Sequence, residues 1–226
     1  MRRINKSGDV FNVETNGETV KAKHVIWSAG DFQYSNMTQF AGSQHCRHIA
    51  MVNSYEGLAG DDFIIIGGYE SGVDAAFHLS HRDKRVRIFD KNCPWAFQTS
   101  DPSVALSTYT LERMGTEKFN EHVSLYPDTS IQSVTRSGDV YEVLTGNGQT
   151  FHTRTQPLMA EGFRGSHILV EALFENGDNG FPLLNESDES TITPGLFLCG
   201  PSVSYQRQVF FSFTSIGSVL LSWPKP

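Results

Sequence analysis

Residues 67–72, Gly-Gly-Tyr-Glu-Ser-Gly, have the types and spacing that could bind a pyrophosphate group. The pyrophosphate of a dinucleotide is a dianion, and the first turn of a helix offers it unpaired backbone N–H groups and the positive end of a dipole. Glycine in such a turn permits the tight bend, the close approach of the phosphates and the close packing of helix on strand. Gly67 suits the first role and Gly72 the third, with Gly68 and Ser71 between them.

Two side chains make this turn different from a plain glycine loop. Tyr69 stands where the middle glycine is usual, so its side chain must swing aside or the phosphate must lie slightly further out. Glu70 would repel a pyrophosphate, and we expect it to point away, toward first-turn N–H groups or a cofactor hydroxyl. The competing interpretation is a turn that needs glycine for backbone reasons alone.

An acidic residue, Asp90, lies 23 positions after Gly67, where a carboxylate can accept both ribose hydroxyls of NAD. Lys91 is adjacent, and this cation could instead bind the 2′-phosphate of NADP. Further cations precede the expected strand: Arg82, Lys84 and Arg85. The charge of Asp90 favours NAD, the cations favour NADP, and on balance we expect NADP.

These residues need a strand before the turn, a helix after it and a second strand alongside. Phe63–Ile66 is a continuous apolar run, typical of a buried parallel strand. Apolar side chains recur at helical spacing over Val73–Arg82, and Val86–Asp90 is the next expected strand. The pattern further predicts helices over 107–120 and 166–174, and strands over 122–125, 131–135 and 196–199.

An internal repeat flanks this α/β unit. Ser-Gly-Asp-Val occurs at residues 7–10 and again at 137–140. Each copy continues through a Gly/Asn turn into a second strand, and the alternation of apolar and polar residues predicts a β-meander. The second strands are expected over 19–25 and 149–153, and the following strands, which end in small residues, over 25–32 and 157–163.

The composition of the 226 residues narrows the class of protein. Sixteen Phe, seven Tyr and three Trp predict an ordered chain, and a net charge of −7 without a basic run argues against nucleic-acid and membrane partners. Cys46, Cys93 and Cys199 form no C-x-x-C pair, and His45, Cys46 and His48 suit structural zinc poorly, so we expect no metal. Without a leader or a span-length apolar segment, the expected location is cytoplasmic.

The sequence resembles the flavoproteins that have two dinucleotide domains, in the branch of the flavin-containing monooxygenase-like enzymes and the pyridine nucleotide oxidoreductases. The resemblance follows the family's order over about residues 4–200. The segments that carry it are 25–32, His45 with the linker to Phe63, 67–72 with 74–76, 101–103 with 106–107 and 109–110, 157–163, and 193–200. The family also accounts for the repeat, because each of its nucleotide domains contains one meander.

The resemblance implies an α/β protein in which a Rossmann-like NAD(P)-binding domain with a β-meander is inserted in a partial FAD-binding Rossmann-like domain. The implied domains are 1–44 (partial FAD-binding, first meander), 45–157 (NAD(P)-binding) and 158–226 (return to the FAD-binding domain, and tail). It implies FAD and NAD(P) as cofactors, with hydride passing from NAD(P)H to FAD. Further cofactor-binding residues implied at strand ends are Ser28, Ala29, Gly30, Glu161, Gly162 and Gly200.

The sequence also departs from the family. The family's FAD domain opens with a strand and a glycine turn before its first meander, whereas here the meander starts at residue 4. Many relatives have an acid where Pro201 stands. We therefore interpret the chain as N-terminally incomplete, which argues against FAD binding by this chain alone. Exposed strand edges would favour self-association, with residues 58–156 as the stable core and the flanks mobile.

Three functions stay open on these observations. The first is a flavin-dependent NAD(P)H oxidoreductase, monooxygenase-like, acting on a small-molecule substrate. The second is a truncated, non-catalytic NAD(P)-binding module. The third is a disulfide reductase of the same superfamily, although the lack of a closely spaced cysteine pair argues against a dithiol version. We expect Cys199 to pack in a core and assign no catalytic side chain.

Overall fold

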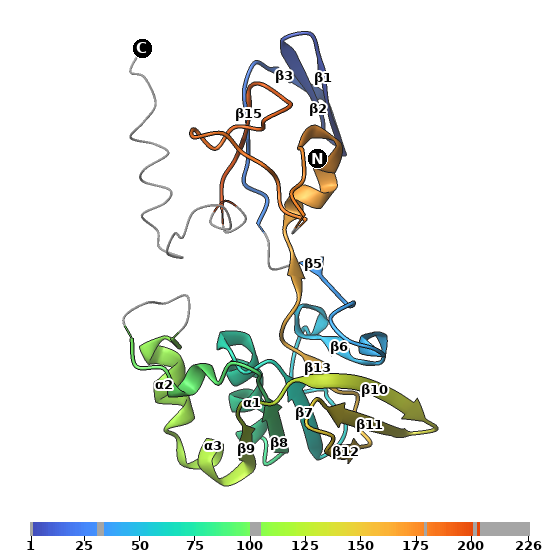
Figure 1. Cartoon of the computed structure of the whole chain (residues 1–226), viewed down its shortest axis with the longest axis vertical. Helices are drawn as coiled ribbons and strands as arrows, with labels where there is room; N and C mark the ends of the chain where they lie inside the picture. The colour runs from blue at the N-terminus through green and yellow to red at the C-terminus, as the bar shows by residue number, and fades with distance from the viewer. Residues whose placement is uncertain (1, 31–33, 100–104, 179, 201–202, 204–226) are drawn as a thin grey trace. The chain divides into compact units, whose positions relative to one another are not determined.

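The computed structural model describes residues 2–30, 34–99, 105–178, 180–200 and 203, in two compact units (Figure 1). Unit 1 combines Met1–Tyr34 with Arg164–Pro226, and unit 2 is continuous over Ser35–Phe163. The chain passes between the units at two short strands, β5 (Tyr34–Ser35) and β14 (Phe163–Arg164). The expected features at 31–32, 101–103, Pro201 and the tail after Val209 lie outside the described residues.

A five-stranded parallel sheet, ordered β6-β13-β7-β8-β9, forms the centre of unit 2. Its central strand, β7, contains the apolar run Phe63–Ile66, whose side chains are at most 2% exposed because both faces of the sheet are covered. The neighbouring strand β8 follows the predicted second strand. The bounds are Arg47–His48 for β6, Asp62–Ile66 for β7, Arg85–Phe89 for β8, Val123–Tyr126 for β9 and Leu158–Met159 for β13.

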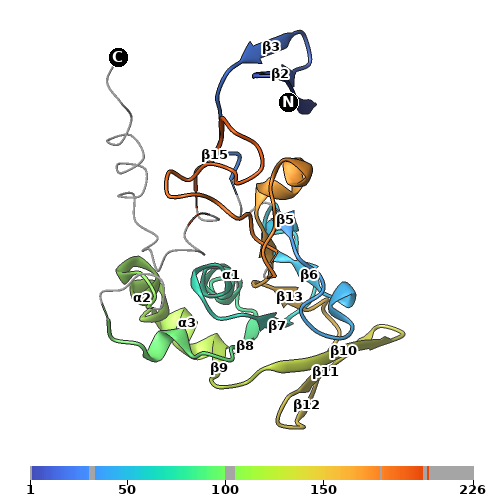
Figure 2. The ribbon, with the colours of Figure 1, turned by 45° about the horizontal axis from the view of Figure 1, so that its top comes forward.

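Helices cover one face of this sheet (Figure 2). The first, α1 (Glu70–Ser80), packs Val73, Ala76 and Leu79 against the sheet and begins three residues before the predicted start, because its first turn is polar. The helix expected over 107–120 is two helices, α2 (Thr108–Met114) and α3 (Glu117–His122). The break follows from Gly115, which ends α2, and the extended backbone of Thr116 before α3.

An antiparallel meander covers the other face (Figure 2). It consists of β10 (Ile131–Ser137), β11 (Val140–Thr145) and β12 (Thr150–Thr153). Val134 and Val143 from the meander pack on Ile64 and Phe89 of the sheet. Three short 3₁₀ helices complete the unit: η1 (Ser43–His45), η2 (Ile49–Met51) and η3 (Pro94–Ala96).

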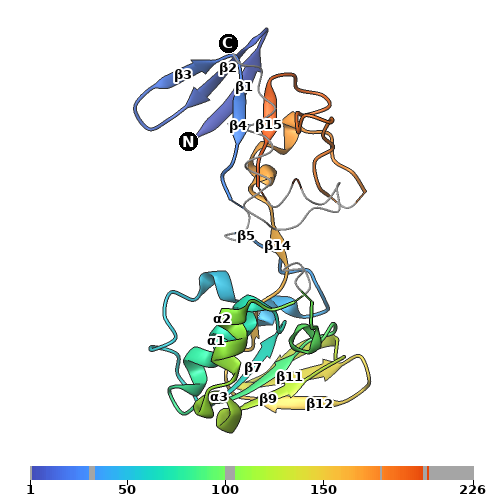
Figure 3. The same ribbon diagram turned by 90° about the vertical axis from the view of Figure 1, so that its left-hand side faces the viewer.

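Unit 1 contains the other meander, which comes first in the chain and is formed by β1 (Arg3–Ser7), β2 (Val10–Glu14) and β3 (Thr19–Ala22). Its core is small and gathers Phe11, Trp27, Val170, Phe174 and two leucines. These leucines belong to β15 (Leu196–Leu198), which pairs in parallel with β4 (Val25–Trp27), as Figure 3 shows.

The repeated tetrapeptide has a different role from the one that the sequence pattern indicates. Ser-Gly-Asp-Val forms the hairpin turn between the first two strands of each meander, so a further strand precedes it. Gly8 and Gly138 occupy the same left-handed conformation there, with φ of 58° and 61°. The repeat therefore marks a turn that requires positive φ, which glycine adopts without steric cost.

Other segments are shorter than predicted. The strand expected over 25–32 ends at Trp27, and the one over 157–163 is reduced to β13 before the chain leaves the sheet. The helix expected over 166–174 is the 3₁₀ helix η4 (Ser166–Leu173), interrupted by non-helical Val170. Among the described helices none is long and apolar enough to cross a bilayer.

Candidate dinucleotide site

The glycine turn, Asp90 and Glu161 lie at the same edge of the parallel sheet, because each directly follows or closely follows the carboxyl end of a strand. The strands concerned are the adjacent β13, β7 and β8. Ligands of open α/β sheets bind outside this edge, where connections leave in opposite directions. A cavity of about 550 Å³ opens there. It is lined by Gly67, Tyr69, Asp90, Asn92, Pro94, Phe97, Ala160 and Glu161.

Two glycines of the turn, Gly68 and Gly72, have no room for a side chain, and Gly67 has a left-handed backbone. Gly67 has φ of 98°, and its N–H donates to the carbonyl of Phe89 at 2.8 Å. A Cβ on Gly68 would lie 2.2 Å from the Trp95 ring, and one on Gly72 would lie 1.9 Å from the Gly67 carbonyl oxygen. The turn is thus as tight as the sequence pattern predicts, and the helix starts directly against the strand.

Asp90 connects the glycine turn to the loop after β8. Its Oδ2 accepts from the Gly68 N–H at 2.6 Å, and its Oδ1 accepts from the N–H groups of Asn92 and Cys93 at 2.7 and 3.0 Å. The expectation that Asp90 accepts both ribose hydroxyls is therefore too simple, because Oδ1 is already engaged twice. Oδ2 keeps one lone pair toward the cavity edge.

The side chains of Tyr69 and Glu70 are both bonded to the segment that leads into α2. The Tyr69 hydroxyl donates to the Ala105 carbonyl at 3.0 Å. The Glu70 carboxylate accepts from the backbone N–H and hydroxyl of Ser107 at 2.5 and 3.1 Å, and from the Thr110 hydroxyl. Glu70 therefore caps the beginning of α2, and its carboxylate does not occupy the first-turn N–H groups of α1.

The cations expected to bind a 2′-phosphate do not gather at this edge. Arg82 and Lys84 precede β8, at its amino end, about 13 Å of strand from Asp90. Both form ion pairs there, with Glu56 at 3.1 Å and Asp61 at 2.6 Å. Arg85 begins the same strand, so Lys91 is the cation of the predicted set that remains beside the site.

Glu161 follows β13, and its backbone carbonyl is bonded to His48, a residue for which the sequence suggested only a position in the linker after His45. The Nε2–H of buried His48 donates to the Glu161 carbonyl at 3.1 Å, while its Nδ1 accepts from the Ala50 N–H at 3.2 Å. Burial lowers the pKa of His48, which favours this neutral form. Burial also raises the pKa of the Glu161 carboxyl, which nearby Lys91 opposes. His48 and Glu161 are far apart in the sequence, so the spacing of residues could not have predicted this contact.

The expected residues of unit 1 lie at the ends of its two parallel strands (Figure 3). Ser28, Ala29 and Gly30 follow β4, and Gly200 comes two residues after β15. The Cys199 N–H donates to the Trp27 carbonyl at 2.9 Å, which extends the pairing. Gly30 and Gly200 have φ of 81° and 130°. In the described part of unit 1, no helix directly follows β4 or β15, and its helix, the 3₁₀ helix η4, begins after β14 and Gly165.

The three cysteines are free and none is prepared as a nucleophile. Burial raises the pKa of Cys46 to about 12 and also raises the pKa values of Cys93 and Cys199. Cys199 is half-buried rather than in a core, because it lies just past the end of β15. Within the described ranges, no three His, Cys, Asp or Glu side chains are grouped as metal ligands.

Comparisons with known proteins agree on one family. The model of the pyridine nucleotide-disulphide oxidoreductase family matches residues 1–200. Bacilliredoxin reductase Bdr of Bacillus subtilis (strain 168) is 23% identical over 194 residues, which cover 85% of this chain and 57% of that protein. The chain thus spans little more than half the length of this relative.

Solved structures show the same fold at low identity. The bacillithiol disulfide reductase Bdr of Staphylococcus aureus matches with a TM-score of 0.65 at 15% identity, over 87% of this chain and 59% of that one. The thioredoxin reductase of Lactococcus lactis matches with a TM-score of 0.66 at 16% identity, over 98% of this chain and 70% of that one. These likenesses establish a Rossmann-like α/β fold with a parallel sheet.

Proposed function

This chain belongs to the pyridine nucleotide-disulphide oxidoreductase family, and from that premise we propose that unit 2 binds a nicotinamide dinucleotide for a flavin-dependent disulfide reductase. The observation that supports this most is the cradle at the β7–α1 turn. Glycine is sterically required there at Gly68 and Gly72, and the cradle opens on a cavity of about 550 Å³. A purely structural turn would need the glycines but not the cavity beside them.

The disulfide-reductase reading replaces the monooxygenase-like one as the favoured activity. The family model and the named relatives concern disulfide reduction. FAD and NAD(P)H are the cofactors of this family, and together they carry hydride from the nicotinamide to an acceptor. In this proposal, the role of the chain is to bind the dinucleotide at the sheet edge and to exclude water from it.

The residues fit the nicotinamide dinucleotide better than they fit FAD. The cradle of unit 2 presents the N–H groups of Glu70 and Ser71 at the start of an eleven-residue helix. In the described part of unit 1, the strand ends at Ser28–Gly30 and Gly200 are the features available to FAD. We therefore derive no step that depends on FAD held by this chain.

The thiol chemistry of such a reductase does not fall on the cysteines of this chain. A thiolate is the reactive form, and the raised pKa values of Cys46, Cys93 and Cys199 keep these thiols protonated at neutral pH. We infer that the disulfide acceptor is reduced at the flavin or at a thiol outside this chain.

The same geometry favours NADH over NADPH. Asp90 carries negative charge where the adenosine ribose would lie, and Arg82 and Lys84 are paired at the opposite end of β8. A like-charge contact with a 2′-phosphate costs affinity. We expect NADH to bind about tenfold more tightly than NADPH, or roughly 1.4 kcal/mol.

A charge placed in the cradle tests the proposal without breaking the fold. Ser71→Asp adds an anion to the first turn of α1, where it favours the helix dipole but repels a pyrophosphate. Fluorescence titration should show NADH affinity reduced at least tenfold in Ser71→Asp and little changed in the neutral Ser71→Asn. Equal affinities in the two folded variants would exclude the cradle as the pyrophosphate site.

The non-catalytic binding module remains the second candidate, because the described residues fit a nicotinamide dinucleotide better than they fit FAD. Binding of FAD distinguishes the disulfide reductase from the non-catalytic module. The reductase requires that the chain take up FAD and show the visible absorbance of bound flavin, and that NADH bleach it. A chain that binds NADH but stays colourless after incubation with FAD would be the module.

A further inference from the structure

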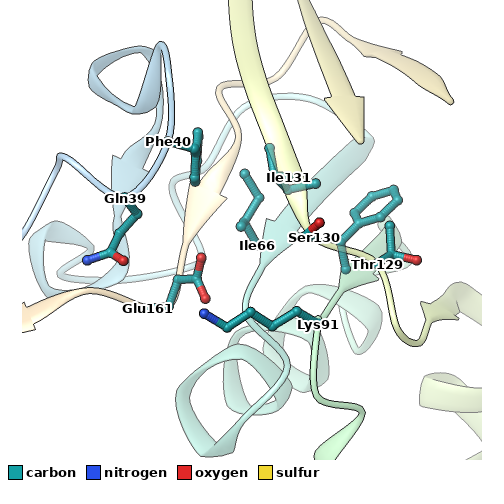
Figure 4. Close-up of a pocket in the computed structure, with 9 residues that line it drawn as sticks. Gln39, Phe40, Ile66, Lys91, Thr129, Ser130, Ile131 and Glu161 are labelled. Carbon is teal, nitrogen blue, oxygen red and sulfur yellow. The ribbon is translucent and has the colours of Figure 1, made fainter. Parts of the chain in front are cut away.

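A second, smaller cavity lies on the meander side of the carboxyl edge and shares Glu161 with the cavity at the glycine turn (Figure 4). Its volume is about 170 Å³. The floor is apolar and the mouth polar. The floor is formed by Phe40, Ile66, Phe89 and Ile131, and the mouth by Gln39, Lys91, Thr129, Ser130 and Glu161.

Two opposite charges face one another across the mouth of this cavity. Figure 4 shows the Lys91 ammonium and the Glu161 carboxylate pointing toward each other, from the ends of β8 and β13. In the described part of the chain, neither side chain belongs to an ion pair. The charge of Lys91 acts on Glu161, whose pKa it lowers, but the two groups form no direct ion pair, so a ligand that carries both charges can contact each of them.

The rest of the cavity fixes the position of these charges. The Glu161 carbonyl is bound by His48, which holds the backbone at the mouth. Gly162 has φ of 81°, and a Cβ there would lie 2.9 Å from the side chain of Gln39. The missing Cβ thus leaves room for the Gln39 amide beside Glu161, as Figure 4 shows.

The floor limits the size and the polarity of a ligand. Ile66 and Phe89 are 2% and 1% exposed, and the Phe89 ring is held by stacking on Tyr126 at 4.5 Å between centroids. A cavity of 150 Å³ holds a benzene molecule, so 170 Å³ suits a ligand of about eight non-hydrogen atoms. An apolar body with two small charged groups at one end matches this shape.

We propose that this cavity binds a small aliphatic α-amino acid as its zwitterion. The carboxylate contacts Lys91, the ammonium contacts Glu161 and the Gln39 amide, and the aliphatic side chain enters the floor. A ligand with only an ammonium or only a carboxylate would contact one of the two charges and not the other. The proposal goes beyond dinucleotide binding, because Lys91 lines this cavity but not the one at the glycine turn.

Calorimetric titration with three related probes tests the site. L-valine carries both charges, valinamide only the ammonium and isovalerate only the carboxylate. We expect L-valine to bind, and both analogues to bind at least tenfold more weakly. Absence of valine binding, or equal binding of the three probes, would overturn the proposal.

Variants test whether the named charges are responsible. Lys91→Gln and Glu161→Gln should each weaken valine binding at least tenfold, whereas Glu117→Gln, an exposed acid on α3, should not. Thermal unfolding of each variant confirms that it is folded. Unchanged affinity in folded Lys91→Gln would contradict the assignment. NADH titration of the same Lys91→Gln protein measures the dinucleotide site separately, so the failure of one proposal does not imply failure of the other.

Discussion

Units 1 and 2 each combine a three-stranded antiparallel meander with parallel strands that end in small residues. They differ in the segment that comes directly after those strands. In unit 2, β7 leads through the glycine turn into α1, whereas β4 of unit 1 leads to Ser28–Gly30, and the helix described in that unit, η4, follows β14 instead. Small residues at a strand end are therefore not enough to form a pyrophosphate cradle. A helix must begin there, so that its N–H groups and dipole reach the ligand.

The two meanders differ in packing as well. Val143 of β11 is fully buried against the parallel sheet, whereas Val20 of β3 is 44% exposed. Both meanders have the same hairpin turn between their first two strands. The burial of their side chains therefore depends on the sheet beside each meander and not on the turn. Unit 2 should accordingly be the more sensitive to substitution.

The largest effect is expected at the cradle. Gly72→Ala places a Cβ 1.9 Å from a backbone oxygen and should lower the free energy of unfolding by about 3 kcal/mol. Gly138→Ala, in a left-handed hairpin turn with open space around it, should cost only about 1 kcal/mol. Urea unfolding measures both, and equal losses would contradict the cradle geometry.

The next effect compares one buried and one exposed valine, each from a different meander. Val143→Ala leaves a cavity in a packed core and should reduce the free energy of unfolding by about 2 kcal/mol. Val20→Ala removes a largely exposed side chain and should change it by less than about 0.5 kcal/mol. If the Val20 variant proved the less stable of the two, β1–β3 would have to be covered by something beyond the described residues.

A smaller, pH-dependent effect is expected from His48. Burial lowers its pKa from the ordinary value of 6.5, so the unfolded chain takes up the proton first as the pH falls. The stability that neutral His48 provides is present above pH 6.5 and is lost as the pH falls through the folded-state pKa. Between pH 7 and pH 5, the free energy of unfolding should depend less steeply on pH in His48→Gln than in the wild type. His24→Gln, which replaces an exposed histidine, should keep the wild-type pH dependence. The same slope in both variants would exclude His48 as the source.

The smallest effect concerns thiol reactivity and leaves the fold unchanged. Cys46 is 4% exposed and its pKa is raised to about 12, whereas Cys93 and Cys199 are only half-buried. Alkylation at pH 8, followed by mass spectrometry, should modify Cys46 at least roughly a hundredfold more slowly than the other two. Rapid labelling of Cys46 in the native chain would mean that β6 opens readily.

Local patterns were sufficient for the strand–turn–helix of unit 2. The apolar run of β7 and the three glycines of the turn each express a steric or burial requirement of adjacent residues. The internal Ser-Gly-Asp-Val repeat likewise located both meanders, although its role as a hairpin turn required the pairing of β1 and β10 to be known.

Contacts between distant segments account for the features that the sequence could not predict. The bond from the Gly68 N–H to Asp90 joins residues 22 positions apart, and that from His48 to Glu161 spans 113. Arg82 and Lys84 are close to Asp90 in sequence, but a strand separates them from it, so proximity along the chain was misleading. Gln39 lies against Gly162, 123 positions further along the chain, where a Cβ would be only 2.9 Å from its side chain.

The central claim is that unit 2 carries the pyrophosphate cradle at Gly67–Gly72. Titration of the ¹⁵N-labelled chain with ADP, which has a pyrophosphate and a ribose but no nicotinamide, tests it residue by residue. We predict that the amide signals of Gly68, Glu70 and Ser71 shift most and saturate together, while those of Ser28 and Ala29 move little. Saturating shifts at Ser28 and Ala29 with an unchanged glycine turn would contradict the claim.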